Sequence, residues 1–167
     1  ATASRDRTAR LWDVRSSKEL VRYEEGHAYL ASSAVFFPDG KTLLTAGVDN
    51  TARLWDVTTG TELARMDGSG RHAAVAVSRD GRWVLTGATA DVAQLWEIAS
   101  NQDPHRGTVL QPQLRQKLGG HRAPVTAVAF SQDGLRIFTG DANGRGQLWD
   151  ATNKPEIRLL HDMRGHT

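Results

Sequence analysis

The sequence predicts an all-β protein built from about three and a half four-stranded antiparallel units, and three observations support this prediction. One frame of residues recurs along the 167-residue chain. Short runs of alternating apolar and polar residues, typical of strands, are separated by Asp-Gly turns. No segment has a sustained apolar period of 3.6 residues, so we expect minimal helix.

The recurring frame consists of an Asp-Gly pair, a Thr that follows the Asp after six residues, and a Trp ten residues later. The three complete frames are Asp39-Gly40 with Thr45 and Trp55, Asp80-Gly81 with Thr86 and Trp96, and Asp133-Gly134 with Thr139 and Trp149. The Thr–Trp interval occurs once more near the start of the chain, between Thr2 and Trp12. The four tryptophans lie 43, 41 and 53 residues apart. A period just above forty is typical of a four-stranded propeller blade.

The segments inside one period have the character of strands. Residues 124–131 are largely apolar and β-branched, which suits a strand buried on both faces. Residues 41–45 and 51–55 follow as second and third strands, with alternating side chains. Residues 62–66 form a more polar fourth strand after a Thr-Thr-Gly turn. The rising polarity indicates a blade that runs from the hub of a propeller to its rim.

Two dipeptides complete the pattern. Gly-His precedes the first strand, and Trp-Asp, or Trp-Glu in one case, closes the third. The pairs are Gly26-His27, Gly120-His121 and Gly165-His166, and Trp12-Asp13, Trp55-Asp56, Trp96-Glu97 and Trp149-Asp150. The chain therefore resembles the WD-repeat family over essentially its whole length. This resemblance implies an open arc of a β-propeller, because closed propellers need about four to eight blades.

The repeats divide the chain into a partial blade (1–25), a second repeat (26–67), a degenerate third repeat (68–119), a fourth repeat (120–164) and the start of another (165–167). Trp96 and His121 are 25 residues apart, against 15 for Trp12 and His27, so about ten residues are inserted. Polar composition with Pro and Gly predicts a loop at about 99–112, on the face opposite Gly-His. A binding role and a tolerated insertion are both compatible with this loop.

In the WD-repeat family, a turn Asp, the His of Gly-His, a second-strand Ser or Thr and the third-strand Trp form a buried hydrogen-bonded tetrad. The resemblance places a complete tetrad on His27, Thr45, Asp49 and Trp55. A buried Trp needs an acceptor for its indole N–H, which a hydroxyl supplies, and His and Asp satisfy the next links. Removing one member of such a network costs about 1–3 kcal/mol.

The other repeats retain only parts of this set. The retained members are Thr2, Asp6, Trp12, Thr86, Trp96, His121, Thr139 and Trp149. In the fourth repeat Asn143 replaces the Asp and can still accept a hydrogen bond. In the third, Ala90 and Gly68 occupy the Asp and His positions, so we expect this blade to be the weakest. The His of the first repeat would precede Ala1.

Three features could indicate chemistry. Asp, His and Thr together could form a nucleophile triad, but the Thr–Trp spacing recurs in every blade, which a unique active site would not require. Residues 141–144 resemble the start of a calcium loop without its remainder, and a structural turn is favoured. Residues 68–72 could form an anion-binding nest, and a degenerate inter-blade loop is favoured. We therefore expect no enzyme, no metal and no cofactor.

Composition limits the remaining classes. Hydrophobic residues make up 39% and charged residues 24%, as in ordinary soluble domains, and no apolar run is long enough to span a membrane. The absence of Cys excludes disulfides and thiolate metal sites. The net charge of +2 is too small and dispersed to predict nucleic-acid binding. With no leader sequence visible, we expect a cytoplasmic location.

The resemblance implies a non-catalytic scaffold that binds a protein or peptide partner. Candidate binding residues beside the Gly-His loops and turn Asp positions are Arg5, Tyr29, Val48, Thr89, Arg122 and Ala142, and the insertion adds His105 and Arg106. The alternative is an accessory propeller of a larger bacterial kinase, protease or nucleotide-binding regulator. An open arc also leaves self-association through its edges as an alternative. A head-to-tail dimer would close poorly, since each junction blade would lack its innermost strand, and we expect a fragment of a longer chain.

Overall fold

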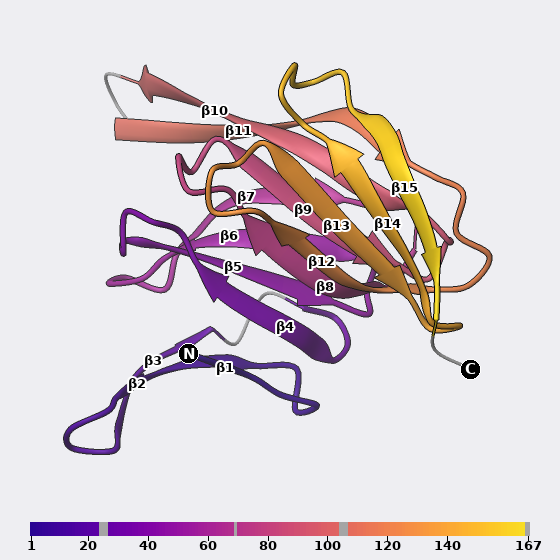
Figure 1. Cartoon of the computed structure of the whole chain (residues 1–167). Helices are drawn as coiled ribbons and strands as arrows, with labels where there is room; N and C mark the ends of the chain where they lie inside the picture. Colours follow the sequence, from indigo (N-terminus) through magenta and orange to yellow (C-terminus); the bar gives the residue numbers. More distant parts are fainter. Residues whose placement is uncertain (24–26, 69, 104–106, 166–167) are drawn as a thin grey trace.

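The computed structural model describes residues 1–23, 27–68, 70–103 and 107–165, which form four antiparallel sheets in an open arc (Figure 1). Blade 1 contains β1 (Thr2–Ala3), β2 (Ala9–Asp13) and β3 (Lys18–Tyr23). Blade 2 contains β4 (Ala31–Phe36), β5 (Thr42–Gly47), β6 (Thr51–Asp56) and β7 (Glu62–Asp67). Blade 3 contains β8 (His72–Val77), β9 (Trp83–Ala88), β10 (Ala93–Asp103) and β11 (Gly107–Leu118). Blade 4 contains β12 (Val125–Phe130), β13 (Arg136–Asp141), β14 (Arg145–Asp150) and β15 (Arg158–Arg164).

The predicted all-β arc is confirmed. Strands follow one another across each sheet in chain order, and β8 lies against both β4 and β12, so the first strands line the inner side of the arc. The described residues contain no helix long and apolar enough to cross a membrane.

The backbone repeats more regularly than the side chains do. The turn between second and third strands holds a residue with left-handed φ at the same place in every blade: Arg7 (73°), Asn50 (67°), Asp91 (58°) and Gly144 (76°). The pairing of third and fourth strands shifts register at the recurring tryptophan of each blade. Blade 3, degenerate in its side chains, therefore keeps the turn and the bulge of its neighbours.

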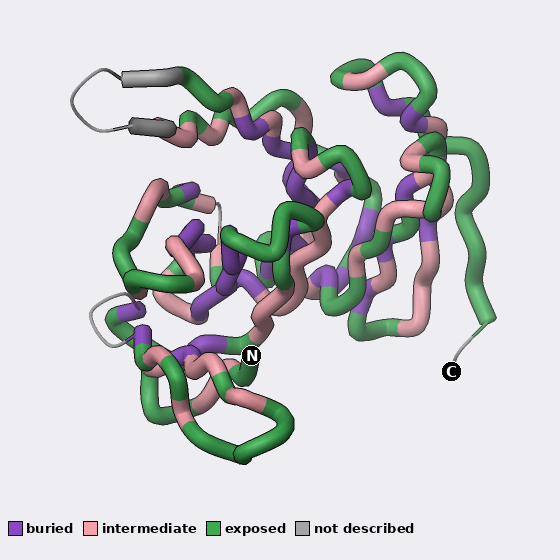
Figure 2. Tube along the Cα trace, turned by 90° about the vertical axis from the view of Figure 1, so that its left-hand side faces the viewer, coloured by how far each residue is buried: buried purple, intermediate pink, exposed green. Residues whose placement is uncertain are grey.

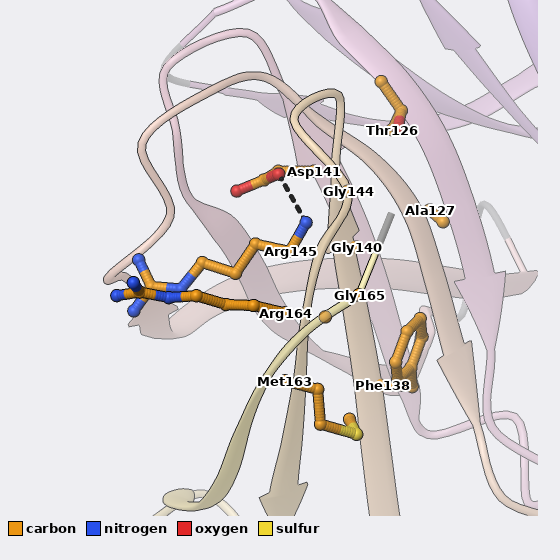
Figure 3. Close-up of a pocket in the computed structure, with 11 residues that line it drawn as sticks. Thr126, Ala127, Phe138, Gly140, Asp141, Gly144, Arg145, Met163, Arg164 and Gly165 are labelled. Atoms are coloured by element: carbon orange, nitrogen blue, oxygen red, sulfur yellow. Dashed lines mark hydrogen bonds between the residues drawn. The ribbon is translucent and has the colours of Figure 1, made fainter. Parts of the chain in front are cut away.

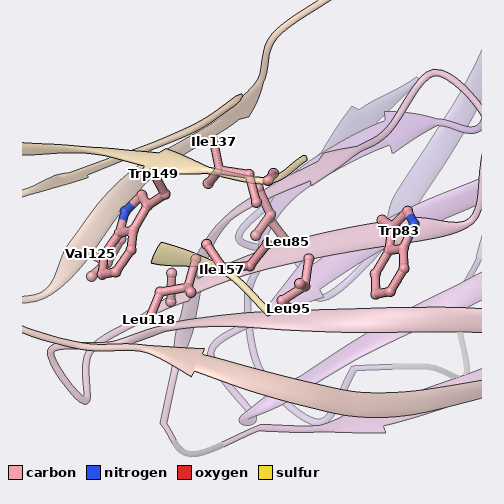
Figure 4. Close-up of a cluster of buried hydrophobic side chains, with 10 residues drawn as sticks. Trp83, Leu85, Leu95, Leu118, Val125, Ile137, Trp149 and Ile157 are labelled. Atoms are coloured by element: carbon pink, nitrogen blue, oxygen red, sulfur yellow. The ribbon is translucent and has the colours of Figure 1, made fainter. Parts of the chain in front are cut away.

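Each blade presents one face to its predecessor, which we call the N-face, and one to its successor, the C-face. Between blades 3 and 4, Leu85, Leu95 and Leu118 of the C-face pack with Ile137 and Trp149 of the N-face (Figure 4). All five side chains are buried. Trp83 joins this cluster, as its position near the start of a second strand suggests.

The other two interfaces have the same composition. Met66 and Leu54 of blade 2 lie in one cluster with Trp96 of blade 3. Tyr23 of blade 1 packs on Trp55 of blade 2, with ring centroids 5.5 Å apart. Apolar burial between faces of adjacent blades thus holds the arc together.

The sequence-based prediction of a loop at about 99–112 is wrong. β10 and β11 pair from Ala93 opposite Leu118 to Asp103 opposite Gly107, with one register shift between Leu95 and Trp96, so the extra residues lengthen a hairpin. Pro112 is tolerated because β11 is the edge strand of its sheet and needs no further donor. The hairpin includes the edge strand of its sheet, where polar side chains can face water. The polar composition of residues 99–112 is therefore compatible with a strand as well as with a loop.

Burial is concentrated in the middle of the arc (Figure 2). The second strands β5 and β9 are buried at every residue, whereas β15 of blade 4 is exposed at every residue. The sheets in the middle of the arc are covered by a neighbouring blade on both faces, whereas each end sheet is covered on one face only.

Candidate functional site

The loops that enter the first strands and the turns between second and third strands lie at the same end of the blades, because the strands are antiparallel. We call this end the top face and define it as residues 4–8, 27–30, 48–50, 70–71, 89–91, 119–124 and 142–144. One main-chain hydrogen bond recurs there in three blades: Val48 to Leu30 (2.9 Å), Thr89 to Arg71 (3.0 Å) and Ala142 to Pro124 (2.9 Å). Each turn is therefore fixed against the adjacent loop.

In blade 2, the four side chains expected to form a tetrad are in hydrogen-bond contact. The Trp55 indole N–H donates to Thr45 Oγ1 at 2.8 Å. His27 Nε2 lies 2.8 Å from the same oxygen, and His27 Nδ1 lies 3.1 Å from Asp49 Oδ1. Thr45 is fully buried, and His27 is nearly so. The chain of bonds thus runs from the inter-blade core to the top face.

One protonation state satisfies every group in this network. If His27 carries its proton on Nδ1, that N–H donates to Asp49 and Nε2 accepts the Thr45 hydroxyl proton. Burial lowers the pKa of His27 and outweighs the opposing influence of Asp49, which favours the neutral ring. Burial alone would raise the pKa of Asp49, but hydrogen bonds from Thr51, Ala28 and His27 lower it and keep the carboxylate charged.

The network extends beyond the residues that the sequence indicated. Asp49 accepts hydrogen bonds from the Ala28 N–H (2.9 Å) and from the Thr51 hydroxyl (2.8 Å). Arg53 donates to Thr51 and forms an ion pair with Glu62. In the sequence, Thr51 and Arg53 follow Asp49 at every second position, which places the three side chains on one face of the strand and could have indicated this extension. The spacing does not show which oxygen each group contacts. The Ala28 bond matters most, since it anchors the loop after His27.

The expectation that Asn143 completes the tetrad of blade 4 is wrong. Asp141 Oδ2 lies 3.0 Å from His121 Nδ1, His121 Nε2 lies 2.7 Å from Thr139 Oγ1, and Trp149 donates to Thr139 at 3.0 Å. Asn143 is exposed, and its main-chain N–H donates to Asp141 at 3.0 Å. The carboxylate reaches the histidine from two residues earlier in the chain. Charge is therefore retained in this network, contrary to the expectation from Asn.

Blade 3 retains only the inner half of the network. Trp96 donates to Thr86 at 3.2 Å, and Ala90 occupies the place of the turn Asp. A Cβ on Gly68 would lie 2.1 Å from His72 Nε2, so the His72 ring fills the space that a side chain at position 68 would need. Within the described residues, neither ring nitrogen of His72 has a partner with hydrogen-bond geometry. Burial lowers the pKa of His72 to about 4, against smaller raising effects of Asp49 and the Asn50 main chain.

Blade 1 shows the network without its histidine. Trp12 donates to Thr2 at 2.9 Å. Asp6 accepts hydrogen bonds from the Thr8 hydroxyl (2.7 Å) and from Arg10 (2.6 Å), and the bonds from Thr8 hold its pKa well below the usual range. These groups are largely exposed, so they contribute little to stability.

The order Asp–His–Thr resembles a nucleophile triad, but the geometry is that of a structural network. Thr45 Oγ1 is already occupied by the Trp55 N–H, and Thr45 has no exposed surface through which a substrate could reach it. Thr139 is equally buried in blade 4. These hydroxyls position loops rather than attack substrates.

The candidate binding residues of the top face differ in exposure. Tyr29 has 64% of its surface exposed, and Val48 is half-buried. The exposed remainder are Arg5, Thr89, Arg122 and Ala142. They are spread over four blades rather than gathered at one point. His105 and Arg106, which the sequence also indicated, lie outside the described residues.

Beside Arg122, the top face has a cavity of about 420 Å³ that the sequence did not indicate. Arg145 and Arg164 line it together with Asp141 and Asn143. Arg145 forms an ion pair with Asp162. Among the described residues, no group of three or more His, Cys, Asp or Glu side chains is placed to hold a metal ion.

A comparison with protein families gives a match to the WD40 model, described as WD domain, G-beta repeat, at residues 18–56 and 112–150. Each match starts in the last strand of one blade, β3 or β11, and ends at the third strand of the next, β6 or β14. The two matched segments contain the two histidine-bearing networks.

Proposed function

Because the chain belongs to the WD-repeat family, whose repeats generally mediate protein–protein interaction, we propose that it is a non-catalytic scaffold that binds a protein or peptide partner through its top face. Family members of this kind are typically non-catalytic. The buried hydroxyls of the tetrads support the same role here.

The observation that carries this proposal is the link between the blade 2 tetrad and Tyr29. His27 is fixed by Thr45 and Asp49, and the Ala28 N–H donates to Asp49. Tyr29 follows directly and is nevertheless 64% exposed. A large aromatic ring on a pre-ordered loop loses little conformational entropy on binding, which is the property of an interface anchor.

Affinity capture with purified chain as bait, followed by measurement of the captured partner's binding, tests the proposal. Tyr29→Ala should weaken binding at least about tenfold, the loss of roughly 1.4 kcal/mol or more typical of an anchor. Leu135→Ala is the matched control, because Leu135 is 43% exposed and lies in the turn before β13, at the opposite end of its blade. Equal binding by wild type and Tyr29→Ala, or equal loss in both variants, would contradict a top-face site.

A further inference from the structure

One main-chain hydrogen bond marks the end of the third strand in each four-stranded blade. The residue two positions after the tryptophan donates to the residue that follows the Asp-Gly turn. The three bonds are Val57 to Lys41 (2.8 Å), Ile98 to Arg82 (2.8 Å) and Ala151 to Leu135 (2.9 Å). In blades 2 and 4 the chain turns directly after this bond, whereas in blade 3 the strand β10 continues to Asp103. The lengthened hairpin thus carries β10 past the end of its inner neighbour β9.

This extension leaves one edge of β10 without a partner. β9 begins at Trp83 and pairs with β10 only as far as Glu97, whereas β11 pairs with the other edge as far as Asp103 (Figure 1). Because main-chain groups alternate between the two edges of a strand, those of Ser100 point the same way as the Ile98 N–H, away from β11. Among the described residues, no main-chain group bonds to Ser100 on this side. An unpaired edge of this kind is a template for another strand.

A groove of about 330 Å³ lies beside the free edge, between blades 2 and 3. Its apolar lining consists of Ile98 of β10, Leu110 of β11, and Phe37 and Pro38 of blade 2. Ile98 and Phe37 are buried in the interface between the two blades, and Leu110 packs against it. The larger groove between Phe138 and Met163 of blade 4 (Figure 3) lies on an end sheet, whereas both walls of this one belong to four-stranded blades.

The rim of the groove is negatively charged. Asp39 and Asp80, from the Asp-Gly turns of blades 2 and 3, line it together with Arg82. Arg82 forms an ion pair with Glu97 at 2.9 Å, and within the described part of the chain neither Asp39 nor Asp80 has an ion-pair partner. Asp80 Oδ1 accepts the hydrogen bonds of its own turn, which leaves Oδ2 available.

Both of these carboxylates are charged at neutral pH. Partial burial would raise the pKa of Asp39 and of Asp80, but hydrogen bonds within their own turns lower it. Lys41 and Lys154 lower these pKa values further from beyond ion-pair distance. The groove therefore combines an apolar floor, two charged carboxylates and a row of unpaired main-chain groups.

We propose that this groove binds an extended peptide segment of a partner protein, which adds as a strand to the free edge of β10. Its main chain pairs with Ser100, and one apolar side chain rests on Ile98 and Leu110. Basic side chains on either side of the apolar one reach Asp39 and Asp80. Strand addition takes its affinity from main-chain hydrogen bonds and its specificity from the pockets that receive side chains.

Two observations favour a single basic segment as the occupant. Turns of two blades line the same groove as the edge, so one extended segment fits it better than the edge of another folded sheet. The chain carries a net charge of +2, so a basic segment has no general attraction to it and is selected by the local carboxylates. The groove lies at the opposite end of the blades from the top face, so this proposal does not depend on the role of Tyr29.

Fluorescence anisotropy with the intact chain and a labelled probe peptide, Lys-Thr-Ile-Thr-Lys between glycines, tests the proposal. We expect saturable binding below about 1 mM. Ser100→Pro should weaken it at least about tenfold, because Pro removes the main-chain donor from the free edge. Ser100→Ala keeps that donor and should bind within about twofold of wild type. The fold tolerates Pro here because this N–H has no partner in the sheet, which matched thermal melts check.

Charge reversal gives an independent arm of the test. The double variant Asp39→Asn with Asp80→Asn should weaken the probe at least about fivefold, whereas Asp133→Asn, in the corresponding turn of blade 4, should not. A probe with Glu in place of Lys should bind wild type at least about tenfold more weakly. Tyr29→Ala should leave probe binding unchanged, which separates this site from the top face.

Three outcomes would overturn the proposal. The first is the absence of saturable binding by the wild-type chain. The second is equal binding by wild type and Ser100→Pro, or equal binding of the Lys and Glu probes. The third is self-association in sedimentation velocity that Ser100→Pro abolishes, because this result would assign the free edge to a second copy of the chain.

Discussion

Blades 2 and 3 have the same backbone and different networks at their top ends. Blade 2 links Trp55, Thr45, His27 and Asp49, whereas blade 3 ends at Thr86 and encloses a His72 ring without a hydrogen-bond partner of good geometry in the described structure. Both second strands are nevertheless buried throughout. A blade with this backbone thus forms without a complete tetrad, and in blade 2 the tetrad also fixes the loop above it.

The largest effect should come from the blade 2 carboxylate. We expect Asp49→Ala to lower the free energy of unfolding by about 3 kcal/mol, because it strands donors of His27, Thr51 and the Ala28 main chain. Urea denaturation measures the loss. Asp91→Asn in blade 3 is the control and should change it by less than about 0.5 kcal/mol. Asn suits the φ of 58° at Asp91, which Ala would not.

A similar experiment in blade 4 tests whether Asp141, rather than Asn143, belongs to the hydrogen-bond network of His121. Asp141→Ala should cost about 2 kcal/mol, less than Asp49→Ala, because Asp141 accepts from His121 and two main-chain N–H groups but from no hydroxyl. Asn143→Ala should cost less than about 0.5 kcal/mol, since its side chain is exposed. The reverse ranking in denaturation would restore Asn143 to the network.

The smallest expected effect is the pH dependence that blade 3 adds. The pKa of His72 is lowered to about 4 in the folded chain, against about 6.5 when unfolded. As pH falls from 6.5 toward 4, the unfolded chain takes up a proton that the folded chain does not, so stability decreases in this window. We expect His72 to account for about 1–2 kcal/mol of the loss between pH 7 and pH 5.

The comparison with His72→Leu isolates this contribution, because the lowered pKa of His27 acts in the same direction in both proteins. As pH falls, the free energy of unfolding should decrease more for the wild type than for His72→Leu. Any stability advantage of the wild type should therefore narrow or reverse. Parallel curves for wild type and His72→Leu would show that the ring is not shielded from protons.

The sequence predicted the parts of this structure that depend on fixed spacing. Thr45 and Trp55 are ten residues apart, and the register of the adjacent strands β5 and β6 brings their side chains within hydrogen-bond distance. Asp141 was missed because the repeats were compared position by position, and the carboxylate was expected four residues after the second-strand Thr. In blade 4 it lies two residues after Thr139, at the position that Gly47 holds in blade 2. The long β10–β11 hairpin was missed because a strand exposed at a rim can have the composition of a loop.

The offset between the matched segments and the blades has a consequence for where the inter-blade contacts lie in the sequence. Residues 18–56 include the outer strand of one blade and three strands of the next, so the matched segment spans the junction between two blades. The contact between Tyr23 of blade 1 and Trp55 of blade 2, with ring centroids 5.5 Å apart, therefore lies within one matched segment. A segment with the bounds of the family match thus carries both sides of an inter-blade contact, whereas a single sheet carries only one side of it.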